Sequence, residues 1–252
     1  MRRGPSTSVT AALAAPDDVS RYSRTTVSEV AADAGVVQSR VQLERLVADD
    51  ELAGRTISGF AAPSVGLRSL DLDNVTIERL DLRGCDAEDS RLERAELRQS
   101  DLRASQWKGG LWHRVRAKDC DLTELDFTGA QILRCELGPV RMARVRFHRA
   151  RIQHTTFKES ELYSADFAGA VLLQVTFEGY EHATVSLSRT DWTGAALFDV
   201  DFKRANMYGA VLRNAVFVRC DLRGVNLCSA DLSGARFVGC ETTGVDLDGA
   251  TF

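Results

Sequence analysis

Large hydrophobic residues recur at every fifth position between Leu67 and Phe252. Of the 37 positions in this series from residue 72 onward, 33 hold Leu, Ile, Phe, Met or Trp, and the exceptions are Ala87, Ala117, His182 and Thr242. A small residue usually stands two positions earlier, as Ala165 does before Phe167. A period of five fits neither an α-helix nor a regular β-strand. The chain therefore combines a short strand with a turn.

The repeat predicts which side chains point inward. If the large residue and the small residue two positions earlier both face the interior, the residue between them faces outward, as strand alternation requires. The remaining two residues must turn the chain, and 12 of the 19 glycines occupy the second of these positions, where the missing Cβ eases a turn. Such a chain coils into a solenoid that buries one continuous interior column. We expect no interruption, because no insertion breaks the five-residue phase.

The repeat resembles that of the pentapeptide repeat family, whose motif is A-[D/N]-L-x-x. Two segments that match it are Ala165-Asp166-Phe167-Ala168-Gly169 and Ala230-Asp231-Leu232-Ser233-Gly234. The resemblance implies an all-β solenoid, a right-handed quadrilateral β-helix in which four pentapeptides form one coil. Residues 55–252 would form this domain, irregular near Ile57 and regular from Leu67, with about nine coils.

The N-terminal residues lack the five-residue repeat and differ from it in composition. Residues 1–24 lack periodicity and are rich in Ser, Thr, Arg, Pro and Ala, which is typical of a flexible arm. Residues 25–54 predict a short helical segment. Thr26 to Glu29 has the form of a capping box, Gly35 would end a first helix, and Ser39 would open a second helix running toward Leu52.

This predicted helix pair allows two interpretations. It is similar to the helix-turn-helix of LacI-type repressors, which implies that a major groove is read by Gln38, Ser39, Arg40 and Gln42. Asp33, however, stands where such motifs usually carry an apolar residue. The alternative, which we prefer, is a helical cap over the first open coil of the solenoid.

Composition and candidate chemistry indicate a protein without catalytic function. The net charge of −4 is small. Five of the six cysteines fill small inward positions, as core residues in a reducing compartment would, and Cys228 alone points outward. The histidines are spread over different coils: His113, His148, His154 and His182. No catalytic, cofactor-binding or metal-binding set is recognisable, and the absence of a signal peptide or a membrane-spanning run predicts a cytoplasmic protein.

One outward column is distinctly acidic if every coil holds the four pentapeptides that the resemblance implies. Acidic residues then occupy eight of nine stacked positions, interrupted only by Arg141. The eight are Asp81, Asp101, Asp121, Glu161, Glu181, Asp201, Asp221 and Glu241. A charged column is often only a solvated surface, but we take this one as a candidate partner-binding face. Arginines gather elsewhere, with Arg94, Arg114 and Arg134 stacked at a corner.

Three functional hypotheses follow. The resemblance extends to quinolone-resistance pentapeptide repeat proteins, which implies a DNA mimic that binds DNA gyrase or topoisomerase through the acidic face and confers fluoroquinolone or toxin resistance. The first alternative is a DNA-binding protein that uses the helix pair or the arginines. The second is an interaction scaffold for an unrelated protein partner.

Two local features complete the sequence-based predictions. Tyr180 and His182 are poorly suited to inward positions, so we expect that pentapeptide to bulge. At the other end of the repeat, Phe198, Val218 and Val238 share one outward column beside the last coil, which ends at Phe252. Apolar residues on adjacent coils next to an uncovered coil predict a homodimer joined through the C-terminal coils.

Overall fold

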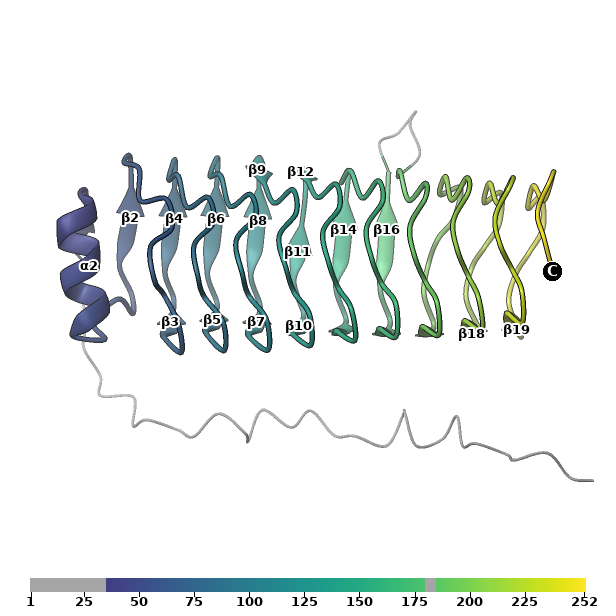
Figure 1. The fold of residues 1–252 in the computed structure, drawn as a ribbon, viewed down its shortest axis with the longest axis horizontal. Coiled ribbons are helices and arrows are strands. Elements are labelled where there is room, and N and C mark those ends of the chain that lie inside the picture. The colour runs from purple at the N-terminus through teal and green to yellow at the C-terminus, as the bar shows by residue number, and fades with distance from the viewer. Residues whose placement is uncertain (1–34, 180–184) are drawn as a thin grey trace, which may run out of the picture. The chain divides into compact units, whose positions relative to one another are not determined.

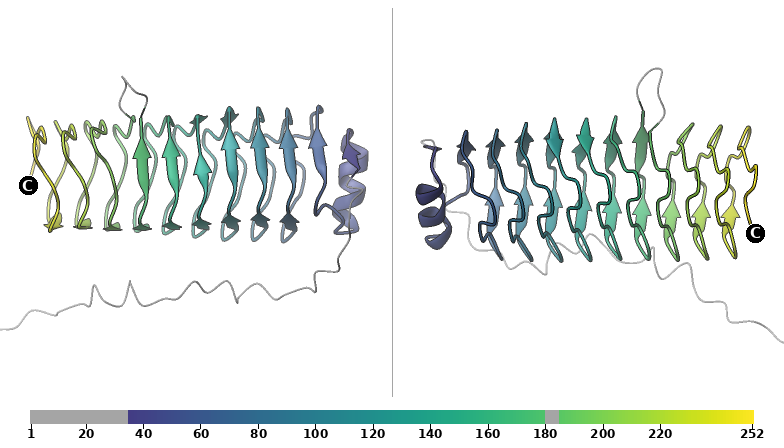
Figure 2. Two further views of the ribbon diagram at one scale, coloured as in Figure 1. Left: turned by 180° about the vertical axis from the view of Figure 1, so that it is seen from behind. Right: turned by 45° about the horizontal axis from the view of Figure 1, so that its top comes forward.

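The computed structural model describes residues 35–179 and 185–252, in which short parallel strands stack into a β-solenoid (Figure 1). Residue pairs 20 positions apart lie side by side in four separate columns, for example Thr56 with Thr76 and Ala61 with Asp81. The solenoid therefore has four faces, and the coils stack through parallel strand pairing as the repeat predicts. Both views in Figure 2 show the same stack from other sides.

Two faces carry extended parallel sheets. An 8-stranded sheet contains β1 Val36–Val37, β2 Thr56–Ser58, β4 Thr76–Glu78, β6 Glu96–Arg98, β8 Arg116–Lys118, β11 Glu136–Leu137, β14 Thr156–Lys158 and β16 Thr176–Glu178. A 9-stranded sheet contains β3 Asp71–Asp73, β5 Arg91–Glu93, β7 Leu111–His113, β10 Gln131–Leu133, β13 Arg151–Gln153, β15 Val171–Leu173, β17 Ala196–Phe198, β18 Val216–Val218 and β19 Arg236–Val238. These nine strands correspond to the nine coils expected after Leu67.

The other two faces are held mainly by single bridges. A 2-stranded sheet joins β9 Cys120–Asp121 to β12 Val140–Arg141, and isolated parallel bridges such as Asp86 with Gln106 continue these faces. Strand pairing on these faces is limited mainly to single bridges because the chain enters a hydrogen-bonded turn directly after the buried large residue. At Phe127, for example, the carbonyl accepts a hydrogen bond from Ala130 N at 2.9 Å, which closes a turn of four residues.

The second corner residue takes a left-handed backbone conformation. Glycine supplies it at Gly129, with φ of 69°, but non-glycine residues supply it as well, including Arg114 and Arg134, each with φ of 56°. A left-handed conformation is costly for residues that carry a Cβ. The stacking of coil on coil therefore imposes this conformation on the corner residues, whatever their intrinsic preference.

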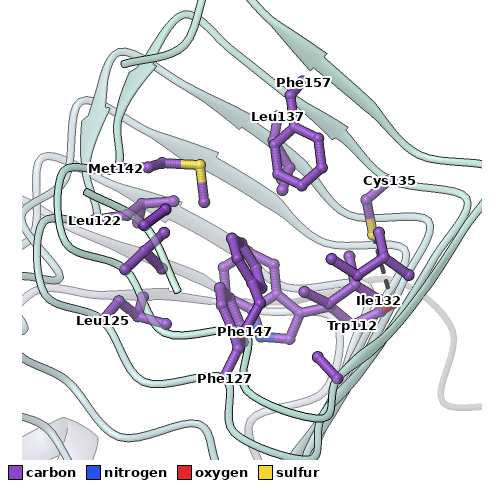
Figure 3. Packing of buried hydrophobic residues seen from close by; sticks show 14 of the residues in the cluster. Trp112, Leu122, Leu125, Phe127, Ile132, Cys135, Leu137, Met142, Phe147 and Phe157 are labelled. Atoms are coloured by element: carbon purple, nitrogen blue, oxygen red, sulfur yellow. Dashed lines mark hydrogen bonds between the residues drawn. The ribbon is translucent and has the colours of Figure 1, made fainter. Parts of the chain in front are cut away.

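The interior is a solid column of apolar side chains, two parts of which are aromatic stacks (Figure 3). Phe127 and Phe147 lie nearly parallel with ring centroids 5.4 Å apart, and the stack continues through Phe167 to Trp192. Phe157 contacts Phe147 edge-on and belongs to the second stack. The described coils thus share one apolar core cluster along the axis.

One coil is longer than the others, which corrects the expectation of an uninterrupted series. Val171 pairs with Ala196 and Glu161 with Ser186, each 25 residues apart instead of 20. The additional five residues coincide with the pentapeptide that contains Tyr180 and His182, where we expected a bulge. Residues 180–184 lie outside the described residues. Because the addition equals one full repeat, the five-residue phase continues unchanged while every later residue moves to a different face.

The solenoid begins earlier than the sequence indicated, and α2 closes its N-terminal end. Val36 and Val37 of β1 pair in register with Thr56 and Ile57 of β2. Helix α2, Arg40–Ala48, follows, with Ser39 Oγ accepting a hydrogen bond from Gln42 N as its N-cap. Its buried residues Leu43 and Leu46 join the same core cluster as Val37. The helix thus packs against the core, and its role as a cap stays a prediction. The predicted first helix and the arm lie outside the described residues.

Candidate binding surfaces

The described residues contain no recognisable metal centre. Within residues 35–179 and 185–252, no group of three His, Cys, Asp or Glu side chains could hold a metal ion. The inward cysteines have the poorly reactive environment expected of core residues, since burial raises the pKa of the Cys85 and Cys135 thiols to about 12. The same stretches include no helix with the length and apolar character that a membrane crossing demands.

The predicted column of eight acidic residues is divided between two faces. The longer coil places Glu161 beside Ser186 and Thr176 beside Asp201. Asp201, Asp221 and Glu241 therefore continue the face of β16 and are not stacked on Glu161. The prediction of one continuous ladder is wrong for these three residues, and Glu181 lies outside the described residues. We name Asp81, Asp101 and Asp121 the first acidic row, and Asp201, Asp221 and Glu241 the second acidic row. Glu161 stays on the face of the first row, separated from Asp121 by Arg141.

The first acidic row is largely neutralised by arginines. Arg83 binds Asp81 at 2.7 Å, and Arg103 binds Asp101 at 2.6 Å. The hydrogen bond from Arg83 holds the pKa of Asp81 below its usual value. Burial alone would raise the pKa of Asp121, but hydrogen bonds from Thr123 and Arg141 lower it overall. The pKa values of Asp81 and Asp121 are thus lowered, and the surface that the first acidic row shares with its arginine partners carries little net charge.

The second acidic row is less compensated. Asp221 binds Arg223, which holds the pKa of Asp221 below its usual value, and Lys203 lies 3.9 Å from the same carboxylate. Across the described residues, neither Asp201 nor Glu241 has a basic side chain within ion-pair distance. Residues 221–252 also hold five acidic residues against two arginines. The C-terminal coils are therefore more anionic than the coils that carry the first acidic row. The sequence alone predicted an acidic column along the whole solenoid.

The apolar residues predicted for a dimer interface differ in exposure. Phe198, Val218 and Val238 stack in one column as expected. Phe198, however, is only 1% exposed and cannot contribute to a surface patch, which corrects its assignment. Val238 and Phe252 are 55% and 81% exposed.

Two residues that the sequence reasoning missed add to this apolar surface. Phe237 and Leu247 are 39% and 43% exposed, although they occupy positions that are buried in the preceding coils. Their place in the regular series predicts inward positions, and the structure leaves both side chains partly exposed. We name the set Phe237, Val238, Leu247 and Phe252 the C-terminal apolar patch.

The candidate DNA-reading residues of α2 are already engaged within the chain. Arg40 Nε binds Glu44 Oε1 at 2.7 Å, and Arg40 Nη1 donates to the carbonyl of Pro63 at 3.1 Å. Ser39 serves as the N-cap, and the Gln42 side chain accepts from Gln38 N at 3.2 Å. Together with the burial of Leu43 and Leu46, these contacts favour the capping role over a recognition helix.

Arginines line a basic depression on the described surface. It has a volume of about 440 Å³ and lies at the corner between the two extended sheets. Its walls are Arg94, Ala95, Glu96, Arg114, Arg116, Arg134, Cys135 and Glu136. We name it the arginine groove. The three corner arginines that the sequence placed in one stack do lie on successive coils, since Arg94 N donates to His113 O and Arg114 N to Leu133 O, each at 2.9 Å.

Comparison with known proteins agrees with this architecture. A family model described as a pentapeptide repeat region matches residues 110–187. A second, described as pentapeptide repeats in eight copies, matches residues 185–214, 205–241 and 215–252. The two models together span more than half of the chain. A search of curated proteins finds no match.

Solved structures of low sequence identity also match the chain. HetL, a pentapeptide repeat protein involved in heterocyst differentiation regulation in the cyanobacterium Nostoc sp. strain PCC 7120, is 19% identical, with 83% of this chain and 95% of HetL covered and a TM-score of 0.42. Full-length QnrB1, a plasmid-mediated fluoroquinolone resistance protein, is 18% identical, with 77% of this chain and 92% of QnrB1 covered and a TM-score of 0.37. The five-residue period, the four-faced coils and the family matches show that the chain belongs to the pentapeptide repeat family.

Proposed function

We propose that this protein acts as a non-enzymatic binding protein that engages protein partners through its C-terminal coils. The observation that carries the proposal is the exposure of all four residues of the C-terminal apolar patch, Phe237, Val238, Leu247 and Phe252. Single apolar residues on a surface are common, but a contiguous group is typical of an interface. The filled interior leaves the outer surface as the place where function resides.

A second copy of the chain is the first partner that we propose for this patch. A two-fold contact brings identical surfaces together, so each copy covers the apolar residues of the other. Burial of this apolar area supplies the driving force, roughly 25 cal/mol for each Å² removed from water. The acidic residues of the C-terminal coils would stay at the rim, where solvent screens their repulsion.

Charged residues within the apolar patch should separate the dimer. We expect Val238→Glu with Phe252→Glu to give a monomer in sedimentation equilibrium, because each dimer would bury four unpaired carboxylates. Tyr163→Glu is a matched control, since Tyr163 is also exposed, at 40%, but lies outside the patch. A monomer for the unmodified chain under the same conditions would contradict the dimer.

DNA gyrase is the further partner that we propose, following the family resemblance to gyrase-binding, quinolone-resistance members. Carboxylates on successive coils repeat at about 4.8 Å, so a row of them offers a regular line of negative charge to a basic DNA-binding surface. The second acidic row supports this role better than the first, because Asp201 and Glu241 lack basic partners among the described residues. Because the predicted acidic column is divided between two faces, we place the proposed DNA-mimicking surface on the C-terminal coils alone.

Charge reversal distinguishes the two acidic rows. We expect the unmodified protein to inhibit supercoiling by gyrase, and the variant Asp201→Lys, Asp221→Lys and Glu241→Lys to lose that inhibition. The matched variant carries Asp81→Lys, Asp101→Lys and Asp121→Lys and should retain most of it, because those carboxylates are already paired. Circular dichroism confirms the fold of each variant. Full inhibition by a folded second-row variant would remove this row from the interface, and no inhibition by the unmodified protein would remove gyrase as the partner.

A further inference from the structure

The arginine groove contains two arginines whose charge is not balanced by a carboxylate in the described part of the chain. Arg94 is engaged by Asp73 and by Glu93, the latter at 3.3 Å. The two glutamates of the groove are also occupied, Glu96 by Arg98 and Glu136 by Arg116 at 3.7 Å. Among the described residues, Arg114 and Arg134 have no carboxylate within ion-pair distance. Two guanidinium groups therefore line the groove without counter-charge.

These two arginines lie one coil apart. Both have left-handed corner conformations, and Arg114 N donates to Leu133 O, next to Arg134, at 2.9 Å. Stacked coils are separated by about 4.8 Å, so two like charges are held close together by the backbone. An oxyanion that binds both would relieve their repulsion and accept hydrogen bonds from each planar guanidinium fork.

The electrostatic effect of this pair reaches its neighbour His113. Burial lowers the pKa of His113, Glu93 at 3.3 Å opposes that shift, and the positive charges of Arg114 and Arg134 lower the pKa further. The pKa of His113 should therefore rise when an anion binds to Arg114 and Arg134, so it reports on bound negative charge.

A second groove shows what a compensated cluster looks like in the same fold. This groove, of about 540 Å³, is lined by Arg83, Arg103 and Arg144 among others. Each of these arginines has a carboxylate partner: Asp81 at 2.7 Å, Asp101 at 2.6 Å and Glu124 at 2.7 Å. The arginine groove is therefore distinguished from this second groove by its uncompensated pair.

We propose that the arginine groove binds a small phosphate-bearing anion, held between the guanidinium groups of Arg114 and Arg134. Arginine forks match the tetrahedral oxygens of phosphate. The surroundings favour a compact anion over a nucleic-acid strand, because Glu96 and Glu136 are part of the groove lining and Asp73 and Glu93 lie beside Arg94. An extended polyanion would have to pass these carboxylates. This site is independent of the C-terminal partner surface.

Calorimetry with inorganic pyrophosphate tests the proposal on the full chain, in a phosphate-free buffer of constant ionic strength. We expect one pyrophosphate per chain, and affinity weakened about a hundredfold or more in Arg114→Gln with Arg134→Gln, since each charge-assisted contact is worth about tenfold or more. The matched control is Arg83→Gln with Arg103→Gln, which also removes two arginines from one groove and should bind as the unmodified chain does.

Histidine titration by NMR supplies a second readout. Saturating pyrophosphate should raise the pKa of His113 in the unmodified chain and leave it unchanged in the Arg114→Gln, Arg134→Gln variant. Three results would overturn the proposal: no pyrophosphate binding by the unmodified chain, equal losses in the two double variants, or a single-stranded oligonucleotide that binds more tightly than pyrophosphate and depends on the same two arginines. The last outcome would assign the groove to nucleic acid.

Discussion

Replacement of Phe167 by Ala should lower the free energy of unfolding by about 3 to 5 kcal/mol. Phe167 is fully buried, lies flat against Trp192 with ring centroids 4.1 Å apart, and stacks on Phe147 at 4.8 Å on its other side. Alanine would leave a cavity between two coils that cannot close, because each coil is fixed by hydrogen bonds to the next. Urea denaturation followed by circular dichroism measures the loss.

Asp166→Ala gives the matched control one residue away. Asp166 points outward, and its Oδ1 accepts a hydrogen bond from Ala168 N at 2.8 Å. Loss of this exposed contact should cost about 1 kcal/mol or less. Similar losses at Phe167 and Asp166 would show that the inward and outward assignments of the repeat are incorrect.

Gly138→Ala is the second substitution for which we expect a large effect. A Cβ at this position would lie 1.7 Å from the carbonyl oxygen of Lys158 and 2.6 Å from its carbonyl carbon, with the backbone φ at 150°. Both atoms belong to the neighbouring coil, so relief requires the coils to separate locally. We expect a loss in unfolding free energy of at least about 3 kcal/mol, at the upper end of the range for overpacked sites.

Gly129→Ala separates this steric effect from the general cost of replacing a corner glycine. Gly129 has φ of 69°, but a Cβ there would meet nothing within 4 Å. The solenoid already holds residues such as Arg114 in the same conformation, so we expect a loss of about 1 kcal/mol. The same denaturation experiment compares the two variants. A Gly138→Ala protein as stable as Gly129→Ala would contradict the close approach to Lys158.

The sequence predicted the fold well because the five-residue period directly records which side chains are buried. Phe127, Phe147 and Phe167 occupy the large inward positions, and all three are fully buried. The first strand was missed because Val36 and Val37 precede the regular series. Its signal was present, since Val37, Ile57 and Ile77 stand at successive 20-residue intervals and pair in register.

The surface could not be predicted as well, because the repeat specifies the interior and leaves the outward positions free. The burial of Phe198 at an outward position is not encoded in the period. Which residue stacks beside Asp201 depends on how many residues form the preceding coil. Coils of 20 and of 25 residues leave the five-residue period unchanged, so the period does not reveal which of the two is present. Tyr180 and His182 marked the exceptional pentapeptide, but their unsuitability for the core did not reveal that later residues change face.

The long coil has a consequence for how pentapeptide solenoids diverge. All four faces accept the same pair of small and large buried residues, so the core does not distinguish one face from the next. Gain of one pentapeptide within a coil would rotate every later residue by a quarter turn about the axis relative to the earlier ones, with the buried composition preserved. Insertion or deletion of single pentapeptides can therefore change which outer face of the later coils continues a given face of the earlier coils. Four such alignments are possible, and none requires a change in the buried residues that stabilise the fold.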